Sequence, residues 1–195
     1  MRNLVRVYPD DLDLETLFAE ALMDTMPWDY WQRDHSPKLE TQEALKALEF
    51  VFSRDPDHPG ANHYYIHIVE AGPHPEQGLG AAARLENYAP EAGHLVHMPS
   101  HIDMRVGQYA EAAAVNERAV LADRAYVSRC LAQGVYPAAY YPPHLHFLWW
   151  ALIFAGRSKD AFATATRAVD YAADNFCGPN QVRQAARLRH LPWLT

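Results

Sequence analysis

Small and apolar side chains recur at helical spacing along most of the chain, in segments that stop at proline. They fall 12, 8 and 5 positions before each proline, at Ala44, Leu48 and Val51 before Pro56, and at Gly78, Ala82 and Leu85 before Pro90. The two prolines are 34 residues apart, and a period of this length is typical of stacked helix–turn–helix units. The pattern therefore predicts a helical repeat.

Two later segments repeat the arrangement of small residues. They contain Gly107, Tyr109, Ala112 and Ala119, and then Gly156, Ser158, Ala161, Ala165 and Ala168. Insertions of about 13 residues in the first unit and about 15 before the fourth interrupt the period. We expect repeats at about 10–58, 59–92, 93–141 and 142–175, followed by a capping helix at 179–191 with Asn180 as its N-cap.

The predicted elements are all helices, because strand signals are weak throughout. We expect helices near 12–25, 41–54, 61–71, 76–88, 93–105, 109–130, 143–155, 158–175 and 180–190. The chain is thus predicted to be a single all-α domain over residues 1–195.

The spacing and the residue sizes resemble those of tetratricopeptide repeat proteins over about residues 10–175. The segments NHYYIHIVEAGPHPE, GHLVHMPSHI and PPHLHFLWW also resemble a subgroup of bacterial multi-repeat proteins of undefined role. The resemblance implies a right-handed superhelix of antiparallel helix pairs, whose first helices line a concave groove, and further repeats upstream of Met1. It carries over no catalytic residues.

Composition narrows the class of partner. Hydrophobic residues make up 49% of the 195 residues, which is enough to build a core and excludes a disordered chain. The net charge is -7 and no run of lysine or arginine is present, so nucleic acid is not expected as a partner. The longest apolar stretch, 147–155, is shorter than the roughly 20 residues of a membrane span. With two cysteines and no signal sequence, we expect a cytoplasmic protein with no membrane partner.

The chain has 11 histidines against 9 glycines. In the repeat that the sequence resembles, positions 2, 5, 9, 12 and 13 of each first helix face the groove. Histidines fill six such positions, where random scatter would place about one. They are His63, His67, His94, His97, His101 and His146. We expect His63, His67, His97, His101 and His146 to bind metal, and His94 to line a substrate pocket.

Spacing supports metal binding by these histidines. His63 and His67, like His97 and His101, are four residues apart and lie on one helix face. Stacked helices lie about 8–10 Å apart, so imidazoles from neighbouring helices can reach one ion at about 2.0–2.1 Å. Pro99 is expected to kink its helix and so to turn His101 towards the cluster or away from it. A zincin motif is excluded because Tyr64 replaces its glutamate.

Other groove positions carry acids and aromatic rings. We expect Glu70 and Glu20 to act as general base or ligand, and Asp24, Tyr140, Tyr141 and Trp150 to line the substrate pocket with His94. His144 alternates with His146 and is expected to face elsewhere. Four histidines in loops or in the cap are expected to be solvated, namely His35, His58, His74 and His190.

The two insertions, 26–38 and 125–142, are rich in aromatic residues: Trp28, Trp31, Tyr136, Tyr140 and Tyr141. Such rings most often serve packing, but long ordered loops also form lids. We expect at least one insertion to fold over the groove beside His97 and His146 and to enclose a small-molecule site.

The sequence therefore predicts a metal-binding repeat protein that holds zinc, copper or iron on histidine. With an open coordination position it would be a metal-dependent enzyme, hydrolytic or redox, acting on a small molecule or peptide. The alternatives are a metal-free adaptor that binds a partner peptide or protein in the groove, a proton-handling or anion-binding histidine groove, and a scaffold fragment of a longer repeat array.

Overall fold

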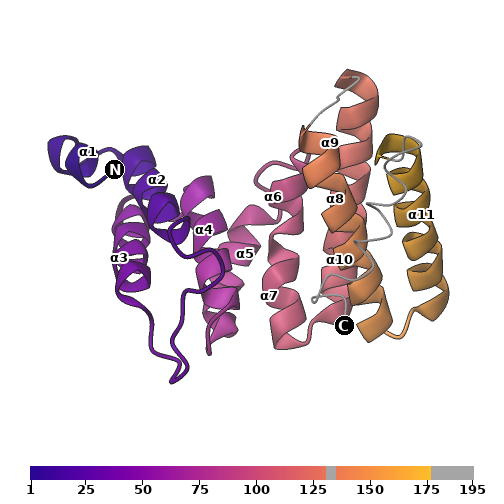
Figure 1. Ribbon diagram of the computed structural model, residues 1–195, viewed down its shortest axis with the longest axis horizontal. Helices are drawn as coiled ribbons and strands as arrows, with labels where there is room; N and C mark the ends of the chain where they lie inside the picture. The colour runs from indigo at the N-terminus through magenta and orange to yellow at the C-terminus, as the bar shows by residue number, and fades with distance from the viewer. Residues whose placement is uncertain (131–134, 177–195) are drawn as a thin grey trace.

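The computed structural model describes residues 1–130 and 135–176, and over these ranges the secondary structure is helical (Figure 1). One isolated bridge, between Trp31 and Pro37, is the exception in the described ranges. The elements are α1 (Arg2–Val7), α2 (Leu12–Met23), α3 (Leu39–Arg54), α4 (Pro59–Glu70), η1 (Pro75–Gly78), α5 (Leu79–Leu85), α6 (Gly93–His97), α7 (Pro99–Val106), α8 (Tyr109–Cys130), α9 (Val135–Ala139), α10 (Tyr141–Phe154) and α11 (Ser158–Phe176). The all-α prediction is confirmed. The expected cap at 179–191, with Asn180 and His190, lies outside the described residues.

Local signals fix the ends of the helices. Asp11 caps α2, since its side chain accepts a hydrogen bond from the Leu14 amide at 3.0 Å. Gly107 and Gly156 adopt φ of 84° and 75° between successive helices, a conformation that favours glycine. The short turn at Gly156 folds α11 back beside α10 in Figure 1.

His58 is the N-cap residue that precedes α4. It was predicted to be solvated, and this prediction is wrong. Its ring is almost buried, and its Nδ1 accepts a hydrogen bond from the Ala61 amide at 3.2 Å. Its Nε2 lies 3.1 Å from a carboxylate oxygen of Asp13. The ring therefore caps α4 and connects it to α2. His35 and His74 are exposed, as expected.

The small residues of the repeat pattern lie at helix contacts, as predicted. Gly78, Ala82, Ala112, Ala119 and Ala161 are buried, and Ala168 is partly buried against the last core. At Gly78 a Cβ would lie 2.5 Å from the Cδ1 of Ile102, so α7 approaches η1 closely because the glycine has no side chain.

Several predicted boundaries are wrong in detail. The helix expected at 93–105 divides into α6 and α7 at Pro99, and the one expected at 76–88 divides into η1 and α5. Proline lacks an amide hydrogen, which explains the first division. Helix α8 ends at Cys130, as predicted for the helix at 109–130. The short helix α9 within the second insertion and helix α1 at the start of the chain were not predicted.

Three apolar cores follow one another along the row of helices in Figure 1. The first joins α2, α3 and α4, the second joins α4, α5 and α7, and the third joins α8, α10 and α11. The helices α4, α6 and α7 therefore lie in the middle of the molecule, where the predicted histidines are concentrated. No described helix has the length and apolar character that a membrane span requires.

Candidate metal centre

Six imidazoles from the middle helices lie against one another. They are His63 and His67 of α4, His94 and His97 of α6, His101 of α7 and His144 of α10. Five of them form a closed circuit of neighbouring rings, with centroid separations of 4.8 Å (His63–His67), 4.9 Å (His67–His101), 4.7 Å (His101–His97), 6.2 Å (His97–His94) and 5.0 Å (His94–His63). His144 lies against this circuit, 4.5 Å from the His97 ring. We call these six residues the histidine cluster.

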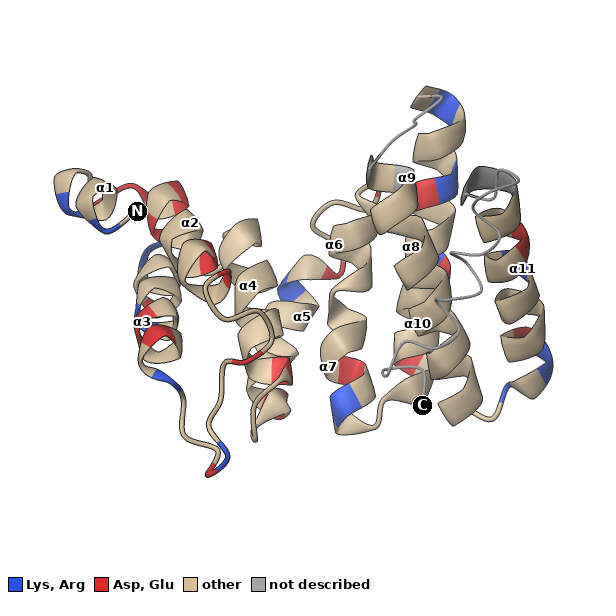
Figure 2. Cartoon of the chain, in the orientation of Figure 1, with Lys and Arg blue, Asp and Glu red and all other residues tan. Residues whose placement is uncertain are grey.

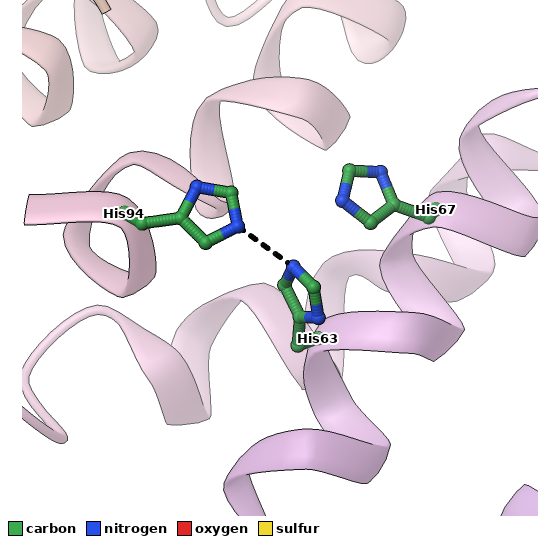
Figure 3. Close-up of side chains that lie close together, drawn as sticks. All are labelled: His63, His67 and His94. Carbon is green, nitrogen blue, oxygen red and sulfur yellow. Dashed lines mark hydrogen bonds between the residues drawn. The ribbon is translucent and has the colours of Figure 1, made fainter. Parts of the chain in front are cut away.

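The first candidate ligand set joins α4 to α6. One ligand atom from each of His63, His67 and His94 lies within 4.8 Å of the others. The Nε2 atoms of His63 and His94 are 2.9 Å apart, and Figure 3 shows the three rings pointing towards one another. The four-residue spacing in α4 places His63 and His67 on one face, as the sequence predicted. His94 was expected to line the pocket, but it lies among the potential ligands.

A second, overlapping set contains His67, Glu70 and His101, whose ligand atoms also lie within 4.8 Å of one another. One carboxylate oxygen of Glu70 is 2.9 Å from His67 Nδ1, and the other is 2.6 Å from His101 Nδ1. Burial acts to raise the pKa of Glu70, but the charge and hydrogen bond of His101, together with His67, outweigh it and lower the pKa to about 2. Glu70 is thus an ionised acceptor that orients two imidazoles, and both its oxygens are already engaged. This favours a role as ligand or orienting group over the predicted alternative of a general base.

Four imidazoles of the cluster, those of His63, His67, His94 and His97, are held in their neutral form. Burial, then the neighbouring rings of His67 and His94, lower the pKa of His63 to about 2. Burial and His144 lower the pKa of His94 to about 3. Burial also lowers the pKa of His67, and it lowers that of His97 well below the usual value. Since a metal binds the neutral ring, these four imidazoles offer nitrogen lone pairs at neutral pH.

His97 and His101 meet across the kink at Pro99. Their Nε2 atoms are 2.9 Å apart, so the break in the helix turns His101 towards the cluster. His97 Nδ1 lies 2.7 Å from the amide oxygen of Asn116 in α8. Both imidazoles are buried, with exposed fractions of 4% and 8%.

The register of α10 is the main error of the sequence prediction. His144, expected to face elsewhere, is buried and joins the cluster, with its Nδ1 2.5 Å from the Asp123 carboxylate. His146, predicted as a ligand, lies against Trp149 and Trp150 of its own helix, with centroid separations of 5.4 and 6.4 Å. Since residues two apart lie on different sides of a helix, the two histidines cannot share one face.

Both insertions bring aromatic rings to the cluster. Trp28 lies 5.3 Å from the His67 ring, and Tyr140 lies 4.8 Å from the His94 ring. Tyr136 donates a hydrogen bond to Asp123 at 2.8 Å. The rings of the two insertions therefore contact His67 and His94. The sequence analysis had instead expected an insertion to fold over the groove beside His97 and His146.

Trp31 anchors the first insertion. Its indole nitrogen donates to the Ile68 carbonyl of α4 at 2.9 Å. The insertion is thus fixed to the helix that carries His63 and His67.

The remaining predicted pocket residues lie apart from one another. Tyr141 is buried in the third core against Tyr171, and Trp150 is half-exposed on α10. Glu20 accepts a hydrogen bond from Tyr64, and the ring centroid of Tyr64 lies 4.7 Å from that of His63. Asp24 is exposed, and its negative charge helps to raise the pKa of Tyr64. The residues of the predicted pocket therefore do not line one common site. Phe147, whose ring centroid lies 4.7 Å from those of both His97 and His101, was not predicted.

Asn116 and Asp123 were also missed, although the sequence holds a signal for them. Together with Ala112 and Ala119 they occupy positions 112, 116, 119 and 123, the spacing of the buried face of α8. A polar amide and a carboxylate on an otherwise apolar face indicate partners elsewhere in the core.

Charged side chains are sparse around the cluster. Of the helices α4, α6 and α10, the only Asp, Glu, Lys or Arg is Glu70, and Figure 2 accordingly shows these helices almost entirely tan. Helix α7 adds Asp103 and Arg105, and Arg105 donates to the main-chain carbonyl of Glu70. The carboxylates of Glu70 and Asp123 are therefore the negative groups that face the imidazoles directly.

Comparison with known proteins gives no relative from which a role could be transferred. No protein-family model matches the chain, and no curated protein or solved structure matches it.

Proposed function

We propose that this protein binds a transition-metal ion through His63, His67 and His94. The observation that carries the proposal is the convergence of three neutral imidazoles, from α4 and α6, within 4.8 Å of one another. Glu70 accepts from Nδ1 of His67 and leaves Nε2 of that ring for the ion. A carboxylate behind a ligating histidine fixes its tautomer and raises its basicity, as in most metal sites.

The donor set favours zinc, copper or iron. Imidazole suits these ions, and the described part of the cluster contains no thiolate, which a structural zinc site normally has. Three protein ligands leave a coordination position open for water or substrate, which is the arrangement of catalytic zinc sites. We extend the proposal to a metal-dependent reaction on a small molecule or peptide that enters beside Trp28 and Tyr140.

The scaffold that we propose for this site is a tetratricopeptide-like stack of helix pairs wound into a right-handed superhelix. The buried small residues at Gly78, Ala82, Ala112 and Ala119 support it, because they allow the close helix approach that such a stack needs. The succession of three cores, each shared by neighbouring helices, supports it as well.

Metal analysis of the purified protein tests the proposal. After loading with Zn²⁺ and removal of free ion, we expect at least one zinc per chain by elemental analysis. His63→Ala and His94→Ala should each lower the zinc content by about one ion, whereas His74→Ala, at an exposed position, should leave it unchanged.

A wild-type protein without tightly bound zinc, copper or iron would overturn the proposal and make a metal-free peptide adaptor the better interpretation. An equal loss in all three variants would show adventitious binding to surface imidazole and would overturn it too. Circular dichroism of each variant confirms that the helices are intact.

A further inference from the structure

The imidazole of His67 belongs to both candidate ligand sets. One set joins it to His63 and His94, and the other joins it to Glu70 and His101. Its Nδ1 faces Glu70, because it lies 2.9 Å from a carboxylate oxygen of that residue. Figure 3 shows the other ring nitrogen, Nε2, on the side of His63 and His94. The two nitrogens of one imidazole therefore point into two different sets.

The contacts within the second set are short enough for one ion. The carboxylate oxygens of Glu70 lie 2.9 Å from Nδ1 of His67 and 2.6 Å from Nδ1 of His101, and the two ring centroids are 4.9 Å apart. Ligands at about 2.0–2.1 Å from a tetrahedral ion are separated from one another by about 3.3 Å. The ligand atoms of this set lie within 4.8 Å of one another, so small movements of the side chains bring all three to one ion.

The neighbouring His97 specifies which nitrogen of His101 carries a proton. Asn116 donates through Nδ2 to the Ala112 carbonyl at 2.8 Å, so its Oδ1 faces Nδ1 of His97, at 2.7 Å, and accepts from it. The Nε2 of neutral His97 therefore presents a lone pair. The atom opposite this lone pair is Nε2 of His101, at 2.9 Å, and it must carry a proton to form a hydrogen bond.

In a neutral His101 this tautomer leaves Nδ1 without a proton. The Nδ1 lone pair then faces an oxygen of the Glu70 carboxylate at 2.6 Å, and two acceptors at this distance repel unless a cation lies between them. The cation is either a second proton on His101 or a metal ion. A metal ion at this point is also within reach of Nδ1 of His67, which faces the other oxygen of Glu70.

The charge of Glu70 also favours a cation here. The carboxylate is largely buried, and its ion pairs among the described residues are with His67 and His101. Arg105 of α7 donates to the main-chain carbonyls of Glu70 and Gly72 instead of to the carboxylate. A buried carboxylate is costly unless its charge is compensated, and a divalent ion between the two imidazoles supplies that charge.

We infer that the histidine cluster holds two transition-metal ions, bridged by the imidazolate of His67. The first ion is that of the proposed function, on Nε2 of His67 together with His63 and His94, and the two-ion arrangement rests on it. The second ion is bound by Nδ1 of His67, a carboxylate oxygen of Glu70 and Nδ1 of His101.

Protons leave or change place when both ions are bound. His67 releases its remaining N–H proton to solvent, because both of its nitrogens are then ligands. His101 keeps one proton, on Nε2, and donates it to Nε2 of His97. The bridging ring couples the two ions electronically, which two sites without a common ligand do not achieve.

Ion counts and magnetic coupling test the two-ion arrangement. Metal-free protein is titrated with Zn²⁺ and, separately, with Cu²⁺, and native mass spectrometry gives the number of ions bound. We expect two ions per chain. Two Cu²⁺ ions joined by an imidazolate couple antiferromagnetically, so the low-temperature EPR signal should grow with the first equivalent of Cu²⁺ and lose most of its intensity with the second.

Variants assign each ion to its ligands. Glu70→Gln and His101→Gln should each bind one ion with an uncoupled EPR signal, because each removes a ligand of the second ion alone. His63→Ala should also bind one uncoupled ion, since it removes a ligand of the first. Glu76→Gln is the matched control for Glu70→Gln, because its carboxylate likewise faces Nδ1 of a histidine, His74, at 3.1 Å, but both side chains are exposed. It should bind two coupled ions.

The results distinguish the second ion from the first. One ion in the wild type that is lost in His63→Ala and retained in His101→Gln overturns the second ion and leaves the proposed function intact. One ion that is lost in His101→Gln and retained in His63→Ala overturns the proposed function and the bridge with it. Two ions with undiminished EPR intensity overturn the bridge.

The remaining results are equally decisive. One ion that is lost in both His63→Ala and His101→Gln indicates a single shared site and overturns the two-ion arrangement. No bound ion overturns both proposals. If a cluster variant fails to fold, the ion count and the EPR signal of the wild type still decide between two bridged ions and one.

Discussion

Single residues decide the chemistry of the cluster through the ring nitrogen that each histidine keeps free. Asn116, Glu70 and Asp123 each engage one Nδ1 and so direct an Nε2 into the cluster. The identity of these partners, more than the number of histidines, distinguishes a prepared site from a group of packed rings, because the partner selects the tautomer.

Asp103, which faces a different side of α7, gives a prediction at this scale. Burial, then the charges of Glu111 and Glu86, raise the pKa of its carboxyl to about 7. In the unfolded chain the same group ionises near 3.8. Between pH 4 and 7 the carboxyl of Asp103 is protonated in the folded state and ionised in the unfolded state. Its contribution to the free energy of unfolding therefore falls as pH rises from about 4 to 7 and stays constant above 7.

Asp103→Asn removes that dependence. The variant should match the wild type near pH 4 and be more stable at pH 8, by about 1–2 kcal/mol once solvent screening of the charge is allowed for. Urea unfolding in the presence of a chelator measures this without any contribution from metal. Equal stability of the two proteins at pH 8 would contradict the assignment.

At the scale of elements, the approach of α6 to α8 depends on Gly93. A Cβ at this position would lie 2.0 Å from an oxygen of Asp123 and 3.0 Å from the Ala119 carbonyl. The side chain of Asp123 is fixed by His144 and Tyr136 and cannot move away freely. The absence of a side chain at one position of α6 thus permits the Asp123–His144 pair in the neighbouring helices.

Gly93→Ala should therefore destabilise the fold by about 1–3 kcal/mol, the usual cost of overpacking. Gly80→Ala in α5 is the matched control. Its Cβ would meet only the flexible end of Arg84 at 3.4 Å, and alanine favours a helix by up to about 1 kcal/mol. Denaturant unfolding should show opposite signs for the two variants, and a neutral Gly93→Ala would refute the close contact.

On the scale of the whole molecule, the histidine cluster joins helices that belong to successive cores. Its histidines lie on α4, α6, α7 and α10. Apolar residues of α4 belong to the first and second cores, those of α7 to the second, and those of α10 to the third. An ion bound to these histidines would therefore cross-link helices of successive cores, which otherwise contact one another through apolar packing.

Excess Zn²⁺ should consequently stabilise the entire fold. A ligand that binds only the folded state contributes about 2.7 kcal/mol at a concentration 100 times its Kd. Thermal unfolding followed by circular dichroism should shift upward with Zn²⁺ and return to its starting value with a chelator. A His63→Ala, His94→Ala double variant should show a smaller shift, and an equal shift in both proteins would place the bound zinc elsewhere.

The sequence by itself determined the helical class, most helix positions and the two histidine pairs at four-residue spacing. These are local properties, since a period of 3.6 residues and a four-residue spacing place His63 with His67, and His97 with His101, wherever a helix forms. Buried small residues at Gly78 and Ala112 were predictable for the same reason.

Tertiary structure alone decided which faces meet. It selected His144 over His146, placed His94 among the clustered imidazoles, and brought Asn116 and Asp123 of α8 behind the rings. A rotation of α10 by two residues, about 200°, exchanges one histidine for the other. That rotation is set by the packing of Leu145, Leu148 and Leu152 in the third core, through contacts between residues far apart in the chain that no local pattern records.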